Sequence, residues 1–338
     1  RVRIAGQDAT DADLIAAFER IEIARGEISL TYYEFGTLGA MLQFIDAAVD
    51  VAILEVGLGG RLDAVNIFDA DAAIVTSVDL DHQAYLGDTR DEIGFEKAGI
   101  YRAECPALCA DPDPPARLMA HMRALHADEW LIGKDFQYEA AEKNWAYRGR
   151  DWVLPNLPLP SMWGVHQIRN AAGAIATLEA LRQIVPVNAS AIAQGVALAR
   201  VAGRFQQIAS APEIVIDVAH NPEAARALAA TLQSHLVAGR NLAVMGILAD
   251  KDAAAVITAL MACFDAWFAC TPESPRALAA GALADHIRQC TDGPVTLCTS
   301  PADALQHALK HAAVDDRIVV FGSFHTVAAV LPHARSSQ

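Results

Sequence analysis

The hydrophobic positions of this chain change their spacing several times, and each change predicts a new element. Residues 10–25 begin with Thr10 and acidic side chains and continue with apolar residues at helical spacing, which predicts a capped amphipathic helix. A second helix is expected over residues 35–48. The run Val-Ala-Ile-Leu-Glu-Val at 51–56 is almost wholly apolar and of strand length, so it predicts a parallel strand that is covered on both faces.

Strands and helices then alternate along the chain. Short apolar runs predict strands at 72–78 and 106–110, and helical patterns follow them at 90–98 and 115–125. This alternation is typical of an α/β fold with a mostly parallel sheet.

An aromatic and proline-rich stretch, residues 126–165, interrupts the alternation and predicts short antiparallel strands. Two helices are expected after it, at 167–184 and 188–199. We place a domain boundary near 200–203, which gives an N-terminal domain of residues 1–200 and a C-terminal domain of residues 203–338.

The C-terminal part repeats the strand–helix rhythm and predicts a smaller, Rossmann-like α/β domain. Its expected strands are 213–218, 242–248, 266–270, 294–298 and 317–323, and its expected helices are 222–236, 252–264, 276–290 and 301–313.

The composition narrows the classes of protein that remain. The chain has 338 residues, 53% of them hydrophobic, and a formal net charge of −15, which disfavours nucleic acid and anionic membranes as partners. No apolar run reaches the roughly 20 residues of a membrane span. The six cysteines show no metal-binding spacing, so we interpret them as reduced thiols of a cytoplasmic protein.

Polar residues follow several of the expected strands, and ligands of open α/β sheets bind at that edge. Glu55 ends the run at 51–56 and precedes a Gly-Leu-Gly-Gly turn and Asp63, while His82 follows the strand at 72–78. A carboxylate at a strand end suits Mg²⁺. Read without context, both segments are equally well explained as ordinary polar loops.

Other polar residues fall at helix positions. Lys97 lies on the helix at 90–98, where a solvated lysine is the simpler interpretation. His166, Gln167 and Asn170 lie in the first turn of the next long helix, where free backbone N–H groups favour a ligand, although simple capping explains them equally.

The C-terminal domain carries a third group of polar residues. Arg204 precedes its first strand, Asp217 and His220 end that strand, and Ser323 ends the last one. These positions predict a rim that faces a ligand.

Nine motifs occur in one order along almost the whole chain: LTYYEFGT, LEVGLGGRLDAVN, TSVDLDHQAYLG, FEKAGI, GVHQIRNA, AGRF, DVAHNPEA, GILADKD and GSFHTV. In this order they resemble the folate branch of the Mur ligase superfamily, the dihydrofolate synthase/folylpolyglutamate synthases. The resemblance implies a Mur-ligase-like central ATPase domain followed by a glutamate-ligase domain. It also implies ATP-dependent ligation of L-glutamate to dihydropteroate and to folates through an acyl phosphate, with ATP and two Mg²⁺ ions, in a monomer.

The resemblance also assigns roles to individual residues. It implies metal ligands at Glu55 and His82, and a carbamylated, catalytic lysine at Lys97. Nucleotide contacts are implied for His166, Gln167, Asn170, Arg204 and Asp217. Substrate contacts are implied for Tyr33 and Asp63 in the pterin pocket and for His220 and Ser323 on the glutamate side. Arg204 and His220 are also expected to serve catalysis.

The sequence departs from the family pattern in three ways. Val65 replaces a usual threonine, Ala202 replaces a usual proline, and no G-x-x-x-x-G-K-[ST] phosphate loop occurs. We therefore expect the chain to be truncated before that loop and to be inactive on its own. Two alternatives remain at this point: a cell-wall Mur ligase, and a non-catalytic relative that binds folate or a protein partner.

Overall fold

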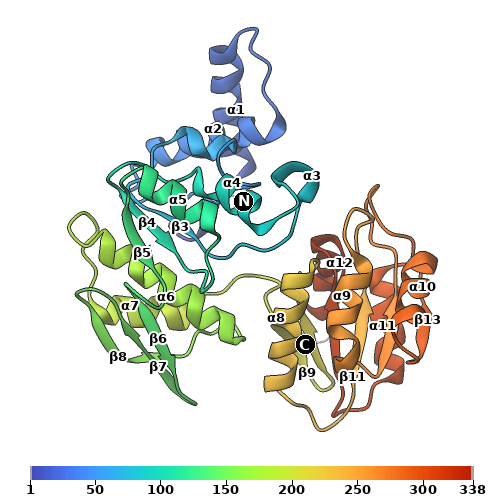
Figure 1. The fold of residues 1–338 in the computed structure, drawn as a ribbon. Helices are drawn as coiled ribbons and strands as arrows, with labels where there is room; N and C mark the ends of the chain where they lie inside the picture. The colour runs from blue at the N-terminus through green and yellow to red at the C-terminus, as the bar shows by residue number, and fades with distance from the viewer. Residues whose placement is uncertain (1, 336–338) are drawn as a thin grey trace. The chain divides into compact units, whose positions relative to one another are not determined.

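The computed structural model describes residues 2–335 (Figure 1). These residues form two compact units, and the division between the units falls between Leu131 and Ile132. The boundary predicted at 200–203 lies inside the second unit and stays a prediction. Within the described residues, no helix combines the length and the apolar character that a bilayer crossing requires.

Two capped helices lie near the start of the N-terminal unit. They are α1 (Asp11–Arg25) and α2 (Tyr32–Asp46). Thr10 accepts a hydrogen bond from the backbone N–H of Asp13, whose side chain returns the contact, and Thr31 and Glu34 form the same capping box on α2. The helix predicted at 10–25 is therefore confirmed, and the second helix begins three residues earlier than expected.

A parallel sheet of order β3-β4-β5 follows, formed by β3 (Ala73–Val75), β4 (Pro106–Cys109) and β5 (Asp128–Leu131). The helices α4 (Arg90–Ala98) and α5 (Ala116–Ala124) match their predicted ranges. Their apolar side chains form one core with β3 and β4, to which Ile93, Leu118 and Met122 contribute. The unit also contains β1 (Arg3–Ile4), β2 (Gln7–Asp8), η1 (Ala64–Ile67) and α3 (Gln83–Leu86).

The strand predicted at 51–56 is wrong. These residues form no strand in the structure, and Ile53 is 88% exposed. A strand exists only where a neighbour accepts and donates its ladder hydrogen bonds, and within the described residues β3 pairs with β4 alone. Apolar composition by itself therefore did not determine the structure of this segment.

The second unit begins with an antiparallel sheet of β6 (Gln137–Ala140), β7 (Asn144–Arg148) and β8 (Val153–Pro158), as the sequence predicts. The helices α6 (Val165–Ala180) and α7 (Ala189–Leu198) follow it.

A six-stranded sheet of order β13-β12-β11-β14-β10-β9 then forms the C-terminal part, parallel except for β9. Its strands are β9 (Gln206–Ser210), β10 (Glu213–Ile216), β11 (Asn241–Met245), β12 (Ala266–Ala269), β13 (Val295–Leu297) and β14 (Arg317–Phe321). Its helices are α8 (Pro222–Ser234), α9 (Ala253–Leu260), η2 (Met261–Cys263), α10 (Ala280–Cys290), α11 (Pro301–His311) and α12 (Phe324–Arg335).

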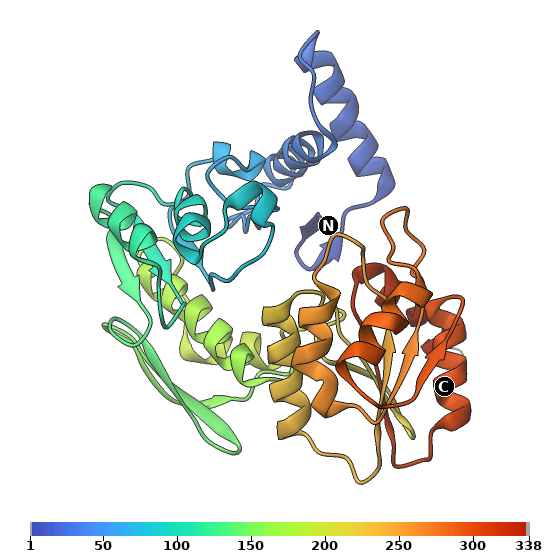
Figure 2. The same cartoon turned by 45° about the vertical axis from the view of Figure 1, so that its right-hand side comes forward.

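Both faces of this sheet are covered. Val215 of β10 packs in a cluster with residues of α8, α9 and α10, whereas its neighbours Ile214 and Ile216 pack with residues of α11 and α12. Figure 2 shows the strands between these two layers of helices. The Rossmann-like prediction is confirmed. Sequence reasoning missed β9, which is short and half polar, and α12.

Candidate active site

Asp63 organises the glycine-rich turn that follows Glu55. One of its carboxylate oxygens accepts hydrogen bonds from the backbone N–H groups of Gly57 (3.0 Å) and Leu58 (2.9 Å), and the other accepts from that of Val65 (3.0 Å). Because a charged acceptor takes up three backbone donors, the turn has one well-defined conformation.

The same turn is attached to the end of α4. The guanidinium of Arg61 contacts both carboxylate oxygens of Glu96 at 3.0–3.2 Å, and its backbone N–H donates to the Glu96 carbonyl at 2.8 Å. Gly60 lies so close that an added Cβ would be 2.9 Å from the carbonyl oxygens of Glu96 and Lys97. These contacts fix the turn against the helix that carries Lys97.

We expect Gly60→Ala to separate the turn from α4. The new methyl group would meet backbone oxygens, which cannot rotate away as a side chain does. The expected result is a loss of about 1–3 kcal/mol in the free energy of unfolding, which urea unfolding would measure. Gly195→Ala is the matched control, because an added Cβ there meets no atom within 4 Å; equal effects of the two changes would refute the close contact.

A cavity of about 300 Å³ opens beside this turn. Tyr33 and Asp63, both predicted to contact substrate, line it together with apolar and acidic neighbours, among them Leu58, Leu62, Tyr85 and Glu96. The Tyr33 hydroxyl donates to the Glu55 carbonyl at 3.3 Å. Burial and the negative charge of Asp63 raise the pKa of Tyr33, so its hydroxyl keeps its proton and acts as a donor.

Glu55 and His82 are both exposed. His82 has a left-handed backbone (φ 51°, ψ 38°), and its N–H donates to the side chain of Asp81 at 2.8 Å. Among residues 2–335, no three His, Cys, Asp or Glu side chains converge on one point as a complete metal site. A carboxylate and an imidazole that face solvent still fit a divalent cation that arrives with a nucleotide, because phosphates and water supply the other ligands.

The start of α6 carries the predicted nucleotide contacts in one turn. The side chains of His166 and Gln167 are 3.1 Å apart, and Asn170 donates to Gln167 at 3.3 Å. Burial, followed by the positive charges of Arg169 and Arg204, lowers the pKa of His166. The Nδ1 atom of His166 and the Nε atom of Arg169 are buried without a hydrogen-bond partner among the described residues. Buried polar atoms of this kind are typical of a site that a ligand completes.

The end of β10 brings three more of the predicted residues together. The Asp217 carboxylate accepts from the backbone N–H groups of Phe205 and Ala219, both at 2.8 Å, and so holds the turn that presents the exposed Arg204. Burial raises the pKa of Asp217. Nδ1 of His220 lies 2.8 Å from the Val218 carbonyl, so Nδ1 carries a proton and donates it to this oxygen.

Ser323 is placed differently from what a substrate contact suggests. Its side chain is buried, and its oxygen accepts from the N–H of Thr326 at 3.0 Å. The Thr326 hydroxyl lies 2.7 Å from it and donates to the Gly246 carbonyl at 2.6 Å. The observed contacts of Ser323 therefore join α12 to the end of β11, and its substrate role stays a prediction.

The structure thus groups Tyr33, Glu55 and Asp63 in the first unit, and two polar clusters in the second. Arg61 and Glu96 lie in two of the sequence motifs, but the sequence did not suggest a function for either residue. Their pairing joins positions 35 apart in the chain, and only the opposite charges could have suggested it.

The comparisons with known proteins agree with this geometry. Residues 203–324 match the family model of the Mur ligase glutamate ligase domain, so fold and site define an α/β ligase of the Mur type. The chain is 42% identical over 331 residues to the dihydrofolate synthase/folylpolyglutamate synthase of Escherichia coli K12, a match that covers 98% of this chain and 76% of that enzyme.

Solved structures give the same result. E. coli FolC in complex with DHPP and ADP superposes with a TM-score of 0.94 at 41% identity, covering 99% of this chain and 78% of that one. A bifunctional folylpolyglutamate synthase/dihydrofolate synthase with Mn, AMPPNP and L-glutamate bound superposes with a TM-score of 0.91 at 39% identity, covering 98% and 79%. This chain belongs to the dihydrofolate synthase/folylpolyglutamate synthase family, whose members are ligases that join glutamate in folate metabolism. The predicted fold and enzyme class are confirmed, and the cell-wall and non-catalytic alternatives are set aside.

Proposed function

We propose that the protein uses ATP to ligate L-glutamate to dihydropteroate and to folates through an acyl phosphate. The observation that best supports this proposal is the cavity beside the glycine-rich turn. Tyr33 supplies an aromatic ring and a protonated hydroxyl to it, and Asp63 holds the turn that forms one of its walls. Its size and its mix of apolar and acidic walls suit the flat, hydrogen-bonding pteridine ring. The DHPP complex of the E. coli relative supports this assignment.

The exposed side chains of Glu55 and His82 are proposed to hold two Mg²⁺ ions together with the phosphates of ATP. Bound there, the cations would neutralise charge on the transferred phosphoryl group. The relative with Mn and AMPPNP supports a divalent cation with a nucleotide. Lys97 lies one residue after Glu96, at the end of α4, and we propose that its carbamylated form adds a negative charge beside the cations.

The first turn of α6 is proposed to bind the nucleotide. His166, whose lowered pKa keeps it neutral, contributes an uncharged ring, and Gln167 and Asn170 contribute amides. Arg204, which precedes the Phe205 N–H that Asp217 binds, would reach the phosphates. These polar atoms lie where the free N–H groups of a helix start favour an anion.

His220 and Ser323 are proposed for the glutamate side. With Nδ1 bound to the Val218 carbonyl, His220 would use Nε2 to accept a proton or a hydrogen bond from the amine. A monomeric enzyme in the cytoplasm is proposed as well; all six cysteines being free supports the compartment.

An isotope experiment, run on a protein that also carries the phosphate loop, tests the acyl phosphate. Dihydropteroate carrying ¹⁸O in its carboxylate should transfer one labelled oxygen to inorganic phosphate for each amide formed, because the carboxylate oxygen leaves with the phosphoryl group. Mass spectrometry of the phosphate measures this transfer. Unlabelled phosphate alongside normal amide formation would contradict the proposed route.

A further inference from the structure

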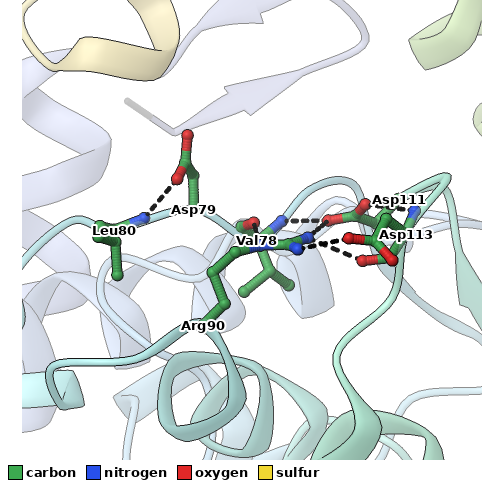
Figure 3. A network of polar contacts seen from close by, with 6 residues as sticks. All are labelled: Val78, Asp79, Leu80, Arg90, Asp111 and Asp113. Atoms are coloured by element: carbon green, nitrogen blue, oxygen red, sulfur yellow. Dashed lines mark hydrogen bonds and ion pairs between the residues drawn. The ribbon is translucent and has the colours of Figure 1, made fainter.

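The loop after β3 is held by side chains at the point where the sheet ends. At the end of the sheet, the N–H of Ala110, the residue after β4, donates to the carbonyl of Val75, the last residue of β3, at 2.9 Å. Three residues further on, the N–H of Val78 donates to the carboxylate of Asp111 at 2.8 Å, and the carbonyl of Val78 accepts from Nε of Arg90 at 2.9 Å. Both polar backbone groups of Val78 are thus bound by side chains (Figure 3).

Arg90 joins three segments of the first unit. It is the first residue of α4, the helix that carries Lys97 near its other end. Its guanidinium donates to the Asp111 carboxylate at 3.2 Å, to the Asp113 carboxylate at 2.8 Å and to the Asp113 carbonyl at 2.8 Å. One planar group therefore fixes the loop after β3 and the loop after β4 against the start of α4.

Asp111 is the buried partner in this network. Its side chain is 7% exposed, whereas that of Asp113 is 88% exposed. One Asp111 oxygen accepts from both Val78 and Arg90, and the other accepts from the N–H of Asp113 at 2.9 Å. A buried carboxylate that leaves its hydrogen-bond donors loses free energy, because no water replaces them. Asp111 therefore has one favourable position.

His82 lies four residues beyond this anchor, in the left-handed conformation that a non-glycine residue adopts at a cost of about 1–3 kcal/mol. Such a conformation persists only where the surrounding structure imposes it. Both backbone groups of Val78 bind side chains of other elements, Arg90 of α4 and Asp111 after β4, whereas the N–H groups of Leu80 and His82 bond to the adjacent carboxylates of Asp79 and Asp81.

We propose that Arg90 and Asp111 are positioning residues, which orient His82 toward its cation by binding both backbone groups of Val78. The inference rests on the proposed metal role of His82 and extends it to two residues that are not among the proposed metal or substrate contacts. Groups that orient a metal ligand typically change the affinity for the metal by about 10- to 100-fold when they are removed.

The test measures Mn²⁺ affinity in the presence of ADP, with the concentration of free Mn²⁺ determined by electron paramagnetic resonance. We expect Arg90→Gln and Asp111→Asn each to weaken Mn²⁺ binding by about tenfold or more, and amide hydrogen exchange of residues 76–82 to accelerate. Asp113→Ala is the matched control. It removes an exposed partner of the same guanidinium but no contact to Val78, so Mn²⁺ affinity should stay within about twofold of wild type.

A double-mutant cycle separates this inference from the function on which it rests. His82→Ala should weaken Mn²⁺ binding, and adding Arg90→Gln should weaken it no further, because the arginine acts through the histidine. Unchanged affinity in His82→Ala would refute the metal role itself. Weakened binding in His82→Ala with normal binding in Arg90→Gln and Asp111→Asn would refute the positioning role alone. Arg90→Lys, which keeps the charge and loses the planar fork, serves if Arg90→Gln does not fold, and it should show the same loss.

Discussion

Glu55→Gln, made in a protein that also carries the phosphate loop, is expected to lower kcat for glutamate addition by roughly a thousandfold, the upper end of what removing one group that stabilises transition-state charge costs. The amide has the same shape as the carboxylate but lacks the charge that would hold a divalent cation beside the phosphates of ATP. Glu55 is exposed, and Tyr33 contacts its backbone carbonyl, not its side chain. The fold and the cavity should therefore remain intact.

Three measurements make that expectation specific. The melting temperature and the affinity for dihydropteroate should match those of the wild type, while Mn²⁺ affinity in the presence of ADP falls with kcat. Glu27→Gln, at another exposed glutamate, is the control for loss of a surface charge and should leave kcat unchanged. Near-normal turnover in Glu55→Gln would remove Glu55 from the proposed metal site.

Local signals in the sequence predicted the elements that local physics determines. The helix α1 follows from Thr10 and Asp13 and from apolar spacing, which all lie within the element itself. The strands β11 and β14 of the C-terminal sheet follow from apolar runs that are buried on both faces. The segment 51–56 shows the limit, because its structure depends on which neighbour offers ladder hydrogen bonds and not on its own residues.

The candidate site divides in the same way. Motif order gave the residues that line the cavity, since Tyr33 and Asp63 lie in stretches with a recognisable pattern. The contacts that hold those stretches in place were not predictable. Arg61 pairs with Glu96, and Arg90 pairs with Asp111. The partners are so far apart in sequence that many other acidic residues could have been the partner of each arginine. Only the packing of the loops onto α4 selects these pairs.

The largest expected effect on stability concerns Glu179, whose side chain is fully buried in α6. Its carboxylate accepts from the Tyr147 hydroxyl at 2.6 Å and from the N–H groups of Asp151 at 2.6 Å and Trp152 at 2.8 Å. Glu179→Ala would leave these donors without their acceptor and open a cavity, so we expect a loss of about 3 kcal/mol or more in the free energy of unfolding.

Glu179→Gln is the discriminating control. Its amide oxygen can keep both backbone donors, and its NH₂ group can donate to Tyr147, whose hydroxyl rotates to become the acceptor. We therefore expect a loss of only about 1 kcal/mol, close to that of Tyr147→Phe, which removes a single hydrogen bond. Urea unfolding followed by tryptophan fluorescence measures all three variants. If Glu179→Ala cost no more than Glu179→Gln, the attachment of the β6–β8 sheet to α6 would not depend on this carboxylate.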